Sequence, residues 1–357
     1  MSQLNEQLVL DALRQIQDPD LHKDIVTLGF IKDLKIDGGL VSFRIVLTTP
    51  ACPVKAEMES AARELVGALP GVSSVAVTMD AEVPKGRGIG DKLAIEGVRN
   101  IIAVSSGKGG VGKSTTAVNL ALGLKSLGLK VGMLDADVYG PSLPRLLGLS
   151  GRPQVKENRL QPMQAYGIKA MSMGFLVDEA TPVVWRGPMV MSALSQMLRE
   201  VDWAPLDVMV VDMPPGTGDA QLTMAQQVGL KGAVIVSTPQ DLALIDARKG
   251  LNMFRQVEVP VLGIVENMSF FLCPSCGTRS DIFGHGGAEA EARKLGVPFL
   301  GAVPLHMTIR ETSDRGEPVT AIDPDGPHAK IYRGIAEKVA AALAGGTTKA
   351  APRIVVE

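Results

Sequence analysis

The chain has 357 residues, of which 46% are hydrophobic, 21% charged and 4% aromatic. At roughly 150 residues per domain this length predicts two domains with enough apolar material for a substantial core. The 36 lysines and arginines nearly balance the 38 acidic residues, and no long basic block is present. We therefore expect no nucleic-acid partner.

The cysteine content and the hydropathy of the chain favour a reducing compartment outside membranes. Three cysteines are too few, and an odd number, for a disulfide framework, which favours a reducing compartment and metal or redox chemistry for paired cysteines. No apolar run reaches the ~18 residues of a membrane span, and residues 1–13 are polar and amphipathic, unlike a signal peptide. We expect a cytoplasmic protein that does not insert into membranes.

Residues 1–80 predict a small α+β domain. Apolar positions between Leu4 and Ile16 fit one helix face, and residues 41–47 alternate as a half-buried strand. Pro53 suits a first helical position, so a second helix is predicted from Cys52 to about Leu69, followed by a closing strand at residues 75–79.

Two segments lack an apolar period. Residues 81–97 mix Pro84 and several glycines with charges, which predicts a flexible linker. Residues 345–357 are small and polar with Pro352, and we expect a disordered tail.

Residues 98–344 predict an α/β domain. Short continuous apolar runs alternate here with helical patterns, and these runs are residues 101–104, 131–134, 208–211, 233–236, 261–265 and 299–303. Strands that are apolar on both faces are typical of a parallel sheet covered by helices. We expect a doubly wound, mostly parallel sheet with functional groups at the carboxyl ends of its strands.

A glycine-rich loop between a predicted strand and a predicted helix contains the pattern G-x-x-x-x-G-K-[ST]. Backbone N–H groups and the helix N-terminus would face phosphates, Lys113 would reach the β- and γ-phosphates, and Ser114 would bind Mg²⁺. The alternative is a glycine-rich turn that binds nothing. The predicted nucleotide-binding residues are Gly107, Lys108, Gly109, Gly110, Val111, Gly112, Lys113, Ser114 and Thr115.

Acidic residues end two of the predicted strands. Asp212 would hold Mg²⁺, and the following loop to Asp219 could sense a γ-phosphate, although Asp219 could instead cap the next helix. Asp135 and Asp137 end the other strand. Either could orient the attacking water while the other caps a turn.

Four segments together resemble one family. They are the loop with Lys108, residues 135–142, residues 185–189 and residues 212–219. They are similar to the Mrp/ApbC family of iron–sulfur cluster carrier ATPases, a P-loop NTPase group in the deviant-Walker-A class that includes MinD, over residues 98 to 340. The resemblance implies that Lys108 reaches across a homodimer to the partner's nucleotide, that Asp137 organises the attacking water and that Asn267 lies near the adenine. An asparagine that ends a strand can also simply make a turn.

Cys273 and Cys276 form a C-x-x-C pair after the predicted strand at residues 261–265. One chain supplies two thiolates here, whereas tetrahedral zinc or a [4Fe–4S] cluster needs four, which a two-fold homodimer would provide. Half of a zinc ribbon and a metal-free thiol pair are the alternatives. The family resemblance implies a [4Fe–4S] cluster bridged between subunits.

Cys52 is predicted at a helix N-terminus, where the thiolate is favoured, so a cluster-relay role and a structural role both fit. The segment around it resembles the small domain associated with iron–sulfur assembly that precedes the ATPase in bacterial members of the family. We expect Met171, Met173, Met189 and Met191 to be core residues rather than soft-metal ligands.

These observations predict a homodimer that binds Mg²⁺ and ATP, hydrolyses ATP slowly as a switch, and passes a [4Fe–4S] cluster from a donor to apo iron–sulfur proteins. One alternative is a MinD-like positioning ATPase, for which Ile331, Ile335 and Val339 would form a membrane-binding helix face. The other is an electron-donating reductase like the nitrogenase iron protein, whose cysteines are widely separated in sequence.

Overall fold

The computed structural model describes residues 4–17, 24–47, 55–81, 94–177 and 187–345. The chain divides into two units, residues 1–90 and 91–357, and each has its own sheet and core. Cys52, Trp185, most of the predicted linker and nearly all of the predicted tail lie outside the described residues.

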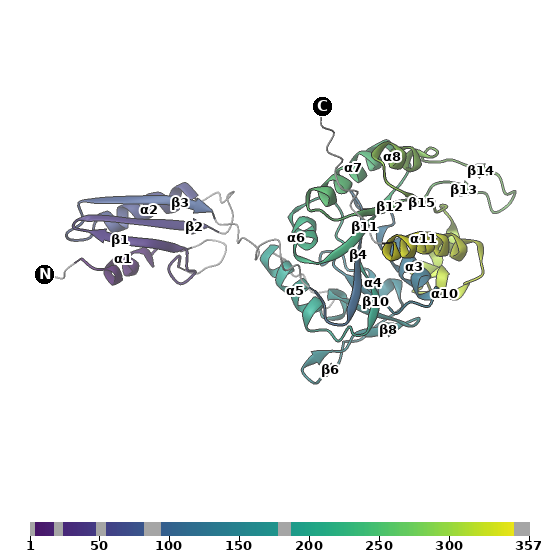
Figure 1. The fold of residues 1–357 in the computed structure, drawn as a ribbon, viewed down its shortest axis with the longest axis horizontal. Coiled ribbons are helices and arrows are strands. Elements are labelled where there is room, and N and C mark those ends of the chain that lie inside the picture. Colours follow the sequence, from purple (N-terminus) through teal and green to yellow (C-terminus); the bar gives the residue numbers. More distant parts are fainter. Residues whose placement is uncertain (1–3, 18–23, 48–54, 82–93, 178–186, 346–357) are drawn as a thin grey trace, which may run out of the picture. The chain divides into compact units, whose positions relative to one another are not determined.

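The smaller unit is a three-stranded sheet with two helices packed on one face (Figure 1). Its elements are α1 (Glu6–Leu13), β1 (Ile31–Asp37), β2 (Leu40–Leu47), α2 (Lys55–Gly67) and β3 (Ser74–Ala81). The central strand β2 pairs antiparallel with β1 and parallel with β3. Its alternate residues Val41, Phe43 and Ile45 are buried under the helices, which confirms the predicted α+β domain.

The larger unit has an eight-stranded sheet that is parallel except for the edge strand β8. In spatial order the strands are β15 (Phe299–Ala302), β12 (Val261–Glu266), β11 (Leu230–Ser237), β4 (Val98–Ser105), β10 (Leu206–Asp212), β5 (Val131–Asp135), β9 (Ile168–Ser172) and β8 (Met163–Ala165). The strand that precedes the glycine-rich loop, β4, is central. Its carboxyl end is therefore flanked by the ends of β11 and β10.

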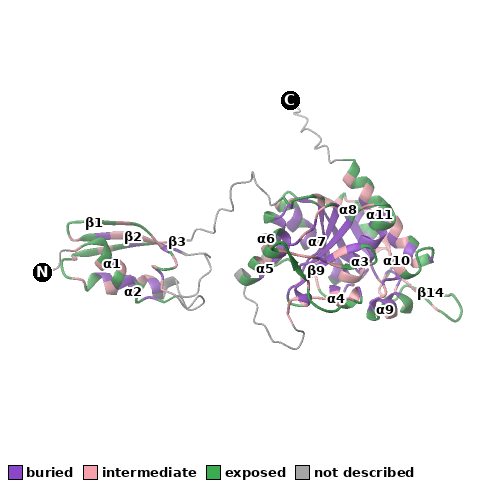
Figure 2. Ribbon diagram, turned by 90° about the horizontal axis from the view of Figure 1, so that it is seen from below, coloured by how far each residue is buried: buried purple, intermediate pink, exposed green. Residues whose placement is uncertain are grey.

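Helices cover both faces of this sheet, and Figure 2 shows the buried strands between them. One face packs against α3 (Lys113–Ser126), α4 (Leu143–Leu146), α9 (Met307–Asp314), α10 (Val319–Ile322) and α11 (Pro327–Ala344). The other packs against α5 (Gly187–Arg199), α6 (Asp219–Gln227), α7 (Asp241–Gln256) and α8 (Gly287–Leu295). This arrangement confirms the predicted doubly wound α/β fold.

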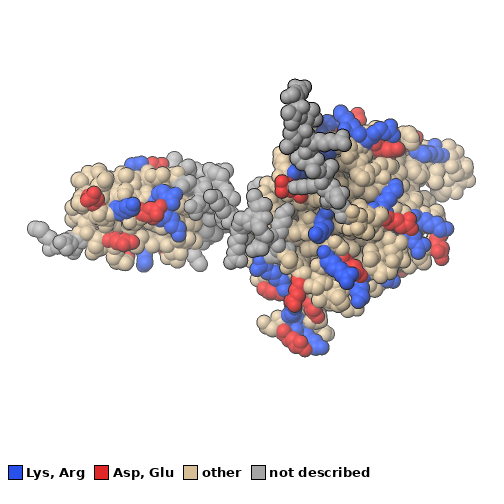
Figure 3. Space-filling model, in the orientation of Figure 1, with Lys and Arg blue, Asp and Glu red and all other residues tan. Residues whose placement is uncertain are grey.

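Short elements complete the larger unit. They are the 3₁₀ turn η1 (Met173–Phe175), the hairpin β6 (Val155–Lys156) and β7 (Arg159–Leu160), and the hairpin β13 (Phe271–Leu272) and β14 (Arg279–Ser280). On the face drawn in Figure 3, basic and acidic side chains of the larger unit are interspersed.

Three local predictions need correction. Helix α6 begins at Asp219 and its N-cap is Gly218, so Asp219 is not the cap. Ile95 belongs to the predicted linker but is buried in the core of the larger unit. Met171 and Met173 are buried as expected, whereas Met189 is 49% exposed.

The apolar stripe of α11 faces the protein interior. Ile335 and Val339 are buried, and Ile335 lies against Gly301 in β15. This packing contradicts the membrane-binding face that the positioning-ATPase alternative requires. Among the described residues, no helix combines the length and apolar character needed to cross a membrane.

Candidate phosphate and metal-binding site

The glycine-rich loop runs from the end of β4 to the start of α3, so the N-terminus of a 14-residue helix points at it. Gly110 and Gly112 have φ angles of 81° and 80°, a region that strongly favours glycine. A Cβ on Gly112 would also lie 2.1 Å from Asn267 Nδ2. Glycines at these positions therefore let the loop backbone turn tightly and leave its N–H groups uncovered by side chains, as phosphate binding requires.

Lys113 and Asp212 form a buried ion pair beneath this loop. Their side chains are 7% and 1% exposed, and Lys113 Nζ lies 2.5 Å from Asp212 Oδ1 and 3.2 Å from Ser114 Oγ. Burial raises the pKa of Asp212, and the Lys113 ammonium and a hydrogen bond with Ser114 oppose this shift. A serine hydroxyl beside a carboxylate is an oxygen donor set that fits Mg²⁺.

The strand ends align because β10 pairs with both neighbours in register. Asp212 lies opposite Val104 of β4 and Asp135 of β5. Asp135 is buried, and its carboxylate accepts hydrogen bonds from the backbone N–H groups of Asp137, Ser142 and Leu143 and from the Ser172 hydroxyl. Burial, with the nearby Asp212 carboxylate, raises the pKa of Asp135 to about 7. Asp135 thus shapes the loop after β5.

Asp137 is differently placed. It is half-buried, and among the described residues its carboxylate accepts one hydrogen bond, a 3.3 Å contact from the N–H of Gly140. Burial raises its pKa, and the positive charge of Lys113 opposes that shift. Of the two aspartates, Asp137 has the carboxylate that can still engage a ligand.

Lys108 lies on the outer part of the loop and is half-buried. Its carbonyl accepts a hydrogen bond from the Ser106 hydroxyl, and its ammonium forms no ion pair with a carboxylate in the described part of the chain. The preceding Gly107 lies directly against Asp246 of α7, because a Cβ there would be 2.1 Å from the Asp246 backbone. Lys108 thus differs from Lys113, whose ammonium forms an ion pair with Asp212 of the same chain.

The loop after β10 is tied to the glycine-rich loop. The N–H of Met213 donates to Val104 O at 3.0 Å, and the N–H of Gly216 donates to Ser106 O at 2.9 Å. Gln221 of α6 donates its side-chain N–H to the carbonyls of Pro214 and Pro215. Gln221 was not among the residues predicted from the sequence, because a glutamine one turn after a proline-rich loop is not a recognisable motif.

The cysteine pair lies on the hairpin β13–β14, which follows β12. The N–H of Cys273 donates to Thr278 O at 3.0 Å, and the N–H of Gly277 donates to Cys273 O at 2.8 Å, which closes the turn. Hydrogen bonds with Thr278, and then with the Cys273 side chain, lower the pKa of the exposed Cys276 thiol. A tight turn with an acidified, accessible thiol suits thiolate ligation.

Within the described ranges, no three or more histidine, cysteine, aspartate and glutamate side chains gather as a metal site. Two thiols are half of the four protein ligands that tetrahedral zinc or a [4Fe–4S] cluster requires.

Asn267 follows β12 and is buried against the glycine-rich loop. Its side-chain Nδ2 donates to Val111 O at 2.8 Å, and its backbone N–H donates to Ser237 O at 2.7 Å. Asn267 thus does more than end a strand. Its proximity to adenine stays a prediction.

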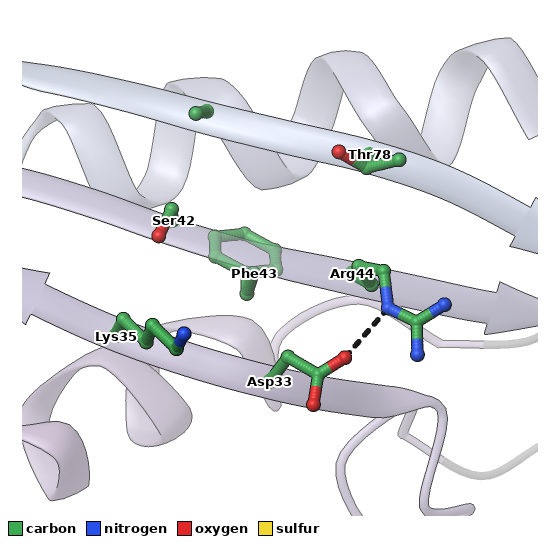
Figure 4. A pocket seen from close by; sticks show the side chains of 7 residues that line it. Asp33, Lys35, Ser42, Phe43, Arg44 and Thr78 are labelled. Atoms are coloured by element: carbon green, nitrogen blue, oxygen red, sulfur yellow. Dashed lines mark hydrogen bonds and ion pairs between the residues drawn. The ribbon is translucent and has the colours of Figure 1, made fainter.

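A shallow pocket lies on the open face of the small sheet (Figure 4). It is lined by Asp33, Lys35, Ser42, Phe43, Arg44, Ala76 and Thr78. Arg44 Nε lies 2.7 Å from Asp33 Oδ2. The lining contains no thiol, so the pocket is chemically different from the cysteine pair.

A central glycine-rich loop, a lysine on a strand-end carboxylate and helices on both faces define a P-loop NTPase. Residues 97–340 match the family described as the NUBPL iron-transfer P-loop NTPase, and residues 6–79 match the iron–sulfur cluster assembly protein family. The first match spans more than half of the chain. The chain therefore belongs to the NUBPL-type iron-transfer P-loop NTPases.

Curated relatives extend this result over nearly the whole length. The iron–sulfur cluster carrier protein of Synechocystis is 50% identical over 343 residues, which are 94% of this chain and 97% of that protein. The iron–sulfur cluster transfer protein NUBPL of Dictyostelium discoideum is 60% identical over 251 residues, covering 70% of this chain and 78% of that protein. These matches confirm the predicted iron–sulfur carrier family.

Solved structures support the fold. A nucleotide-binding protein from Archaeoglobus fulgidus in complex with ADP, with cobalt found, is 40% identical with a TM-score of 0.58, covering 66% of this chain and 92% of that one. The cell-division ATPase MinD of Pyrococcus furiosus is 24% identical with a TM-score of 0.51, covering 68% and 98%. The second likeness concerns the fold alone.

Proposed function

We propose that this chain hydrolyses ATP and carries a [4Fe–4S] cluster that two copies hold jointly and pass to apo iron–sulfur proteins. The proposal rests mainly on the residues that follow the carboxyl end of β12. β12 leads directly into Asn267, which contacts the glycine-rich loop, and then into a hairpin that presents two accessible thiols. Nucleotide and cluster would thus be handled at the same edge of the sheet.

Residues 107–115 would bind the triphosphate, with Lys113 on the β- and γ-phosphates. Ser114 and Asp212 would hold Mg²⁺, directly or through its water shell, because their oxygens lie together. Asp137 would orient the water that attacks the γ-phosphorus, whose bond to the bridging oxygen then breaks and leaves ADP. The ADP complex of the Archaeoglobus relative supports a nucleotide at this loop.

The cysteine hairpin would hold the cluster as cargo. Two thiolates come from each copy, so a two-fold dimer supplies four. The names of the relatives, carrier and transfer proteins, support delivery of the cluster to other proteins. The cytoplasm is the compartment that we propose.

Anaerobic reconstitution with iron and sulfide tests the cluster. We expect absorption typical of iron–sulfur clusters, about two irons per chain and a dimeric mass, because one four-iron cluster would serve two chains. Cys276→Ser should lose the iron and keep its ATP affinity, whereas Ser275→Ala in the same turn should keep both. A monomer with about four irons, or a site that takes only zinc, would contradict the proposal.

Lys113→Ala tests the phosphate site in the same preparation. The variant should lose ATP binding, because the buried ammonium that meets the phosphates is removed. Unchanged hydrolysis in this variant would exclude the proposed site.

ATP hydrolysis by the wild-type protein that depends on an added reductant would instead support the electron-donating alternative.

A further inference from the structure

We propose that Glu266 and Asn267 couple the glycine-rich loop to the cysteine hairpin, with Glu266 acting as a positioning residue for both ends of the segment, residues 269–288, that contains that hairpin. The inference rests on the proposed function, since it concerns how a nucleotide would control the cluster ligands. It assigns a role to a buried acidic side chain that neither phosphate binding nor metal ligation uses.

Glu266 is the last residue of β12 and is 1% exposed. Its Oε1 accepts a hydrogen bond from Ser269 Oγ at 2.5 Å, and its Oε2 accepts one from the N–H of Ala288 at 2.7 Å. Ser269 precedes the cysteine hairpin, and Ala288 follows it in the first turn of α8. One carboxylate therefore fastens both ends of the segment that contains Cys273 and Cys276.

Burying this carboxylate is costly, and an apolar side chain would complete the strand with less desolvation. Ser269 and Ala288 are themselves buried, so their hydrogen bonds have no competing solvent. The position is thus held by specific hydrogen bonds and not by packing alone.

Asn267, the next residue, contacts the glycine-rich loop. Its side chain donates to Val111 O, and Gly112 is so close that no Cβ would fit. A change in the loop backbone at residues 111–112 must therefore displace Asn267 or break its hydrogen bond. Asn267 is covalently joined to Glu266.

Backbone hydrogen bonds on both sides of Asn267 tie this segment to Val303. The N–H of Val303 donates to Glu266 O at 2.8 Å, and the N–H of Ser269 donates to Val303 O at 2.9 Å. On this proposal, these bonds make Asn267 move together with Glu266 and Ser269.

A second connection reaches the same helix from the opposite side of the loop. Gly107 lies against Asp246 of α7, and Arg248 of α7 donates to both carboxylate oxygens of Glu291 in α8 at 2.6 and 3.0 Å. Helix α8 begins next to Ala288, the residue that Glu266 holds. Contacts from both sides of the phosphate loop thus reach the segment that contains the cysteine hairpin or the helix that follows it.

Thiol reactivity measures the coupling without a bound cluster. The full chain is treated with iodoacetamide, with and without Mg²⁺ and a non-hydrolysable ATP analogue, and mass spectrometry of peptides gives the alkylation rates of Cys273 and Cys276 separately from Cys52. In the wild type we expect the analogue to change the rate about fivefold or more, the lower range of measured site-to-site coupling.

Glu266→Ala should cut this ratio by at least half, because only the connection through α7 and α8 remains, while ATP affinity changes less than about threefold. Glu266→Gln should keep the wild-type ratio, because its carbonyl can accept from Ala288 and its amide can donate to Ser269. Ser269→Ala, which removes one hydroxyl and keeps the N–H of Ala288 on Glu266, should at least halve the ratio. Arg255→Ala is the matched control. It removes a hydrogen bond to Leu295 O at the far end of α8 and should leave the ratio unchanged.

A wild type that binds both nucleotide and cluster, yet shows equal alkylation with and without the analogue, would overturn this coupling and leave the proposed function standing. The same follows if both Glu266→Ala and Ser269→Ala retain the full ratio, because dimer formation alone would then protect the thiols. Failure to bind ATP or iron at all would instead count against the proposed function.

Discussion

Asp135 and Asp137 are two residues apart, yet their carboxylates have different surroundings. Asp135 accepts hydrogen bonds on both oxygens from three backbone N–H groups and one hydroxyl, whereas Asp137 accepts a single long one from the residues that the structure describes. Asp137→Asn should therefore lower the rate of ATP hydrolysis by about 10²–10⁴-fold, the usual contribution of a positioned acid or base. ATP affinity, measured by equilibrium binding, should stay within about threefold of wild type.

Asp135→Asn serves as the comparison for that experiment. Its amide would face backbone N–H groups that now donate to the carboxylate, so the change should lower the midpoint of thermal unfolding before it affects turnover per folded molecule. Hydrolysis that survives intact in Asp137→Asn and disappears in Asp135→Asn would reverse the assignment of the two residues.

The side chain of Thr278 influences the pKa of the Cys276 thiol. Hydrogen bonds with Thr278 are the main reason that the pKa of Cys276 is lowered, so more thiolate is present at a given pH than in an ordinary cysteine. Thr278→Val should raise this pKa, and the midpoint of the pH profile for alkylation of Cys276 should move to higher pH. Ser275→Ala, exposed in the same turn, should leave the profile in place, and an unshifted midpoint in Thr278→Val would contradict this account.

At the scale of secondary-structure elements, helix α11 is a structural part of the domain core. Ile335→Ala should lower the free energy of unfolding by about 2–5 kcal/mol, because it removes a buried side chain beside Gly301 of β15. Glu337→Ala on the exposed face should change it by less than about 0.5 kcal/mol. Urea denaturation provides the comparison. A negligible loss in Ile335→Ala, or wild-type binding to lipid vesicles through this helix, would refute the packing argument.

The sequence predicts those elements whose apolar pattern is uninterrupted. All six predicted strands of the larger sheet are present, because strands covered on both faces consist of continuous apolar residues. Other strands were not predicted, among them β1 of the smaller sheet and β9 of the larger one. In β1 a bulge at Asp33, which has a φ of 53°, breaks the alternation, and in β9 Lys169 interrupts the apolar run while donating to the carbonyls of Asp202, Trp203 and Ala204.

Within the candidate site too, residues in a local sequence motif could be predicted, whereas residues that act on distant segments could not. The glycine-rich loop and C-x-x-C pair are local patterns, so the sequence locates their residues without a fold. Glu266 and Gln221 act on backbone groups of other segments, such as the N–H of Ala288 and the carbonyl of Pro214. Only the folded chain brings these groups together, so no local pattern could identify them.

For the whole molecule, the central prediction is that catalysis requires two chains. If Lys108 acts on the partner's nucleotide, a Lys108→Ala chain and an Asp137→Asn chain should each be inactive alone. In a mixed dimer, one site would combine the intact Asp137 of one chain with the intact Lys108 of the other. Random mixing should restore about a quarter of wild-type turnover, because about half of the dimers are mixed and each has one intact site.

Mixing each variant with itself provides the baseline for this assay. Recovery well above that baseline is expected only when Lys108 acts between chains. No recovery on mixing, with dimers present by light scattering, would place Lys108 in the site of its own chain.

Because the cysteines lie outside the hydrophobic cores, their chemistry is separated from the stability of the nucleotide domain. None of the described residues from Phe271 to Gly286 contributes to either hydrophobic core of the larger unit, and much of the hairpin is exposed. Oxidative damage at the thiols, or departure of the inorganic centre, should therefore leave the nucleotide domain folded. The same polypeptide could go through many rounds of loading and release without having to refold.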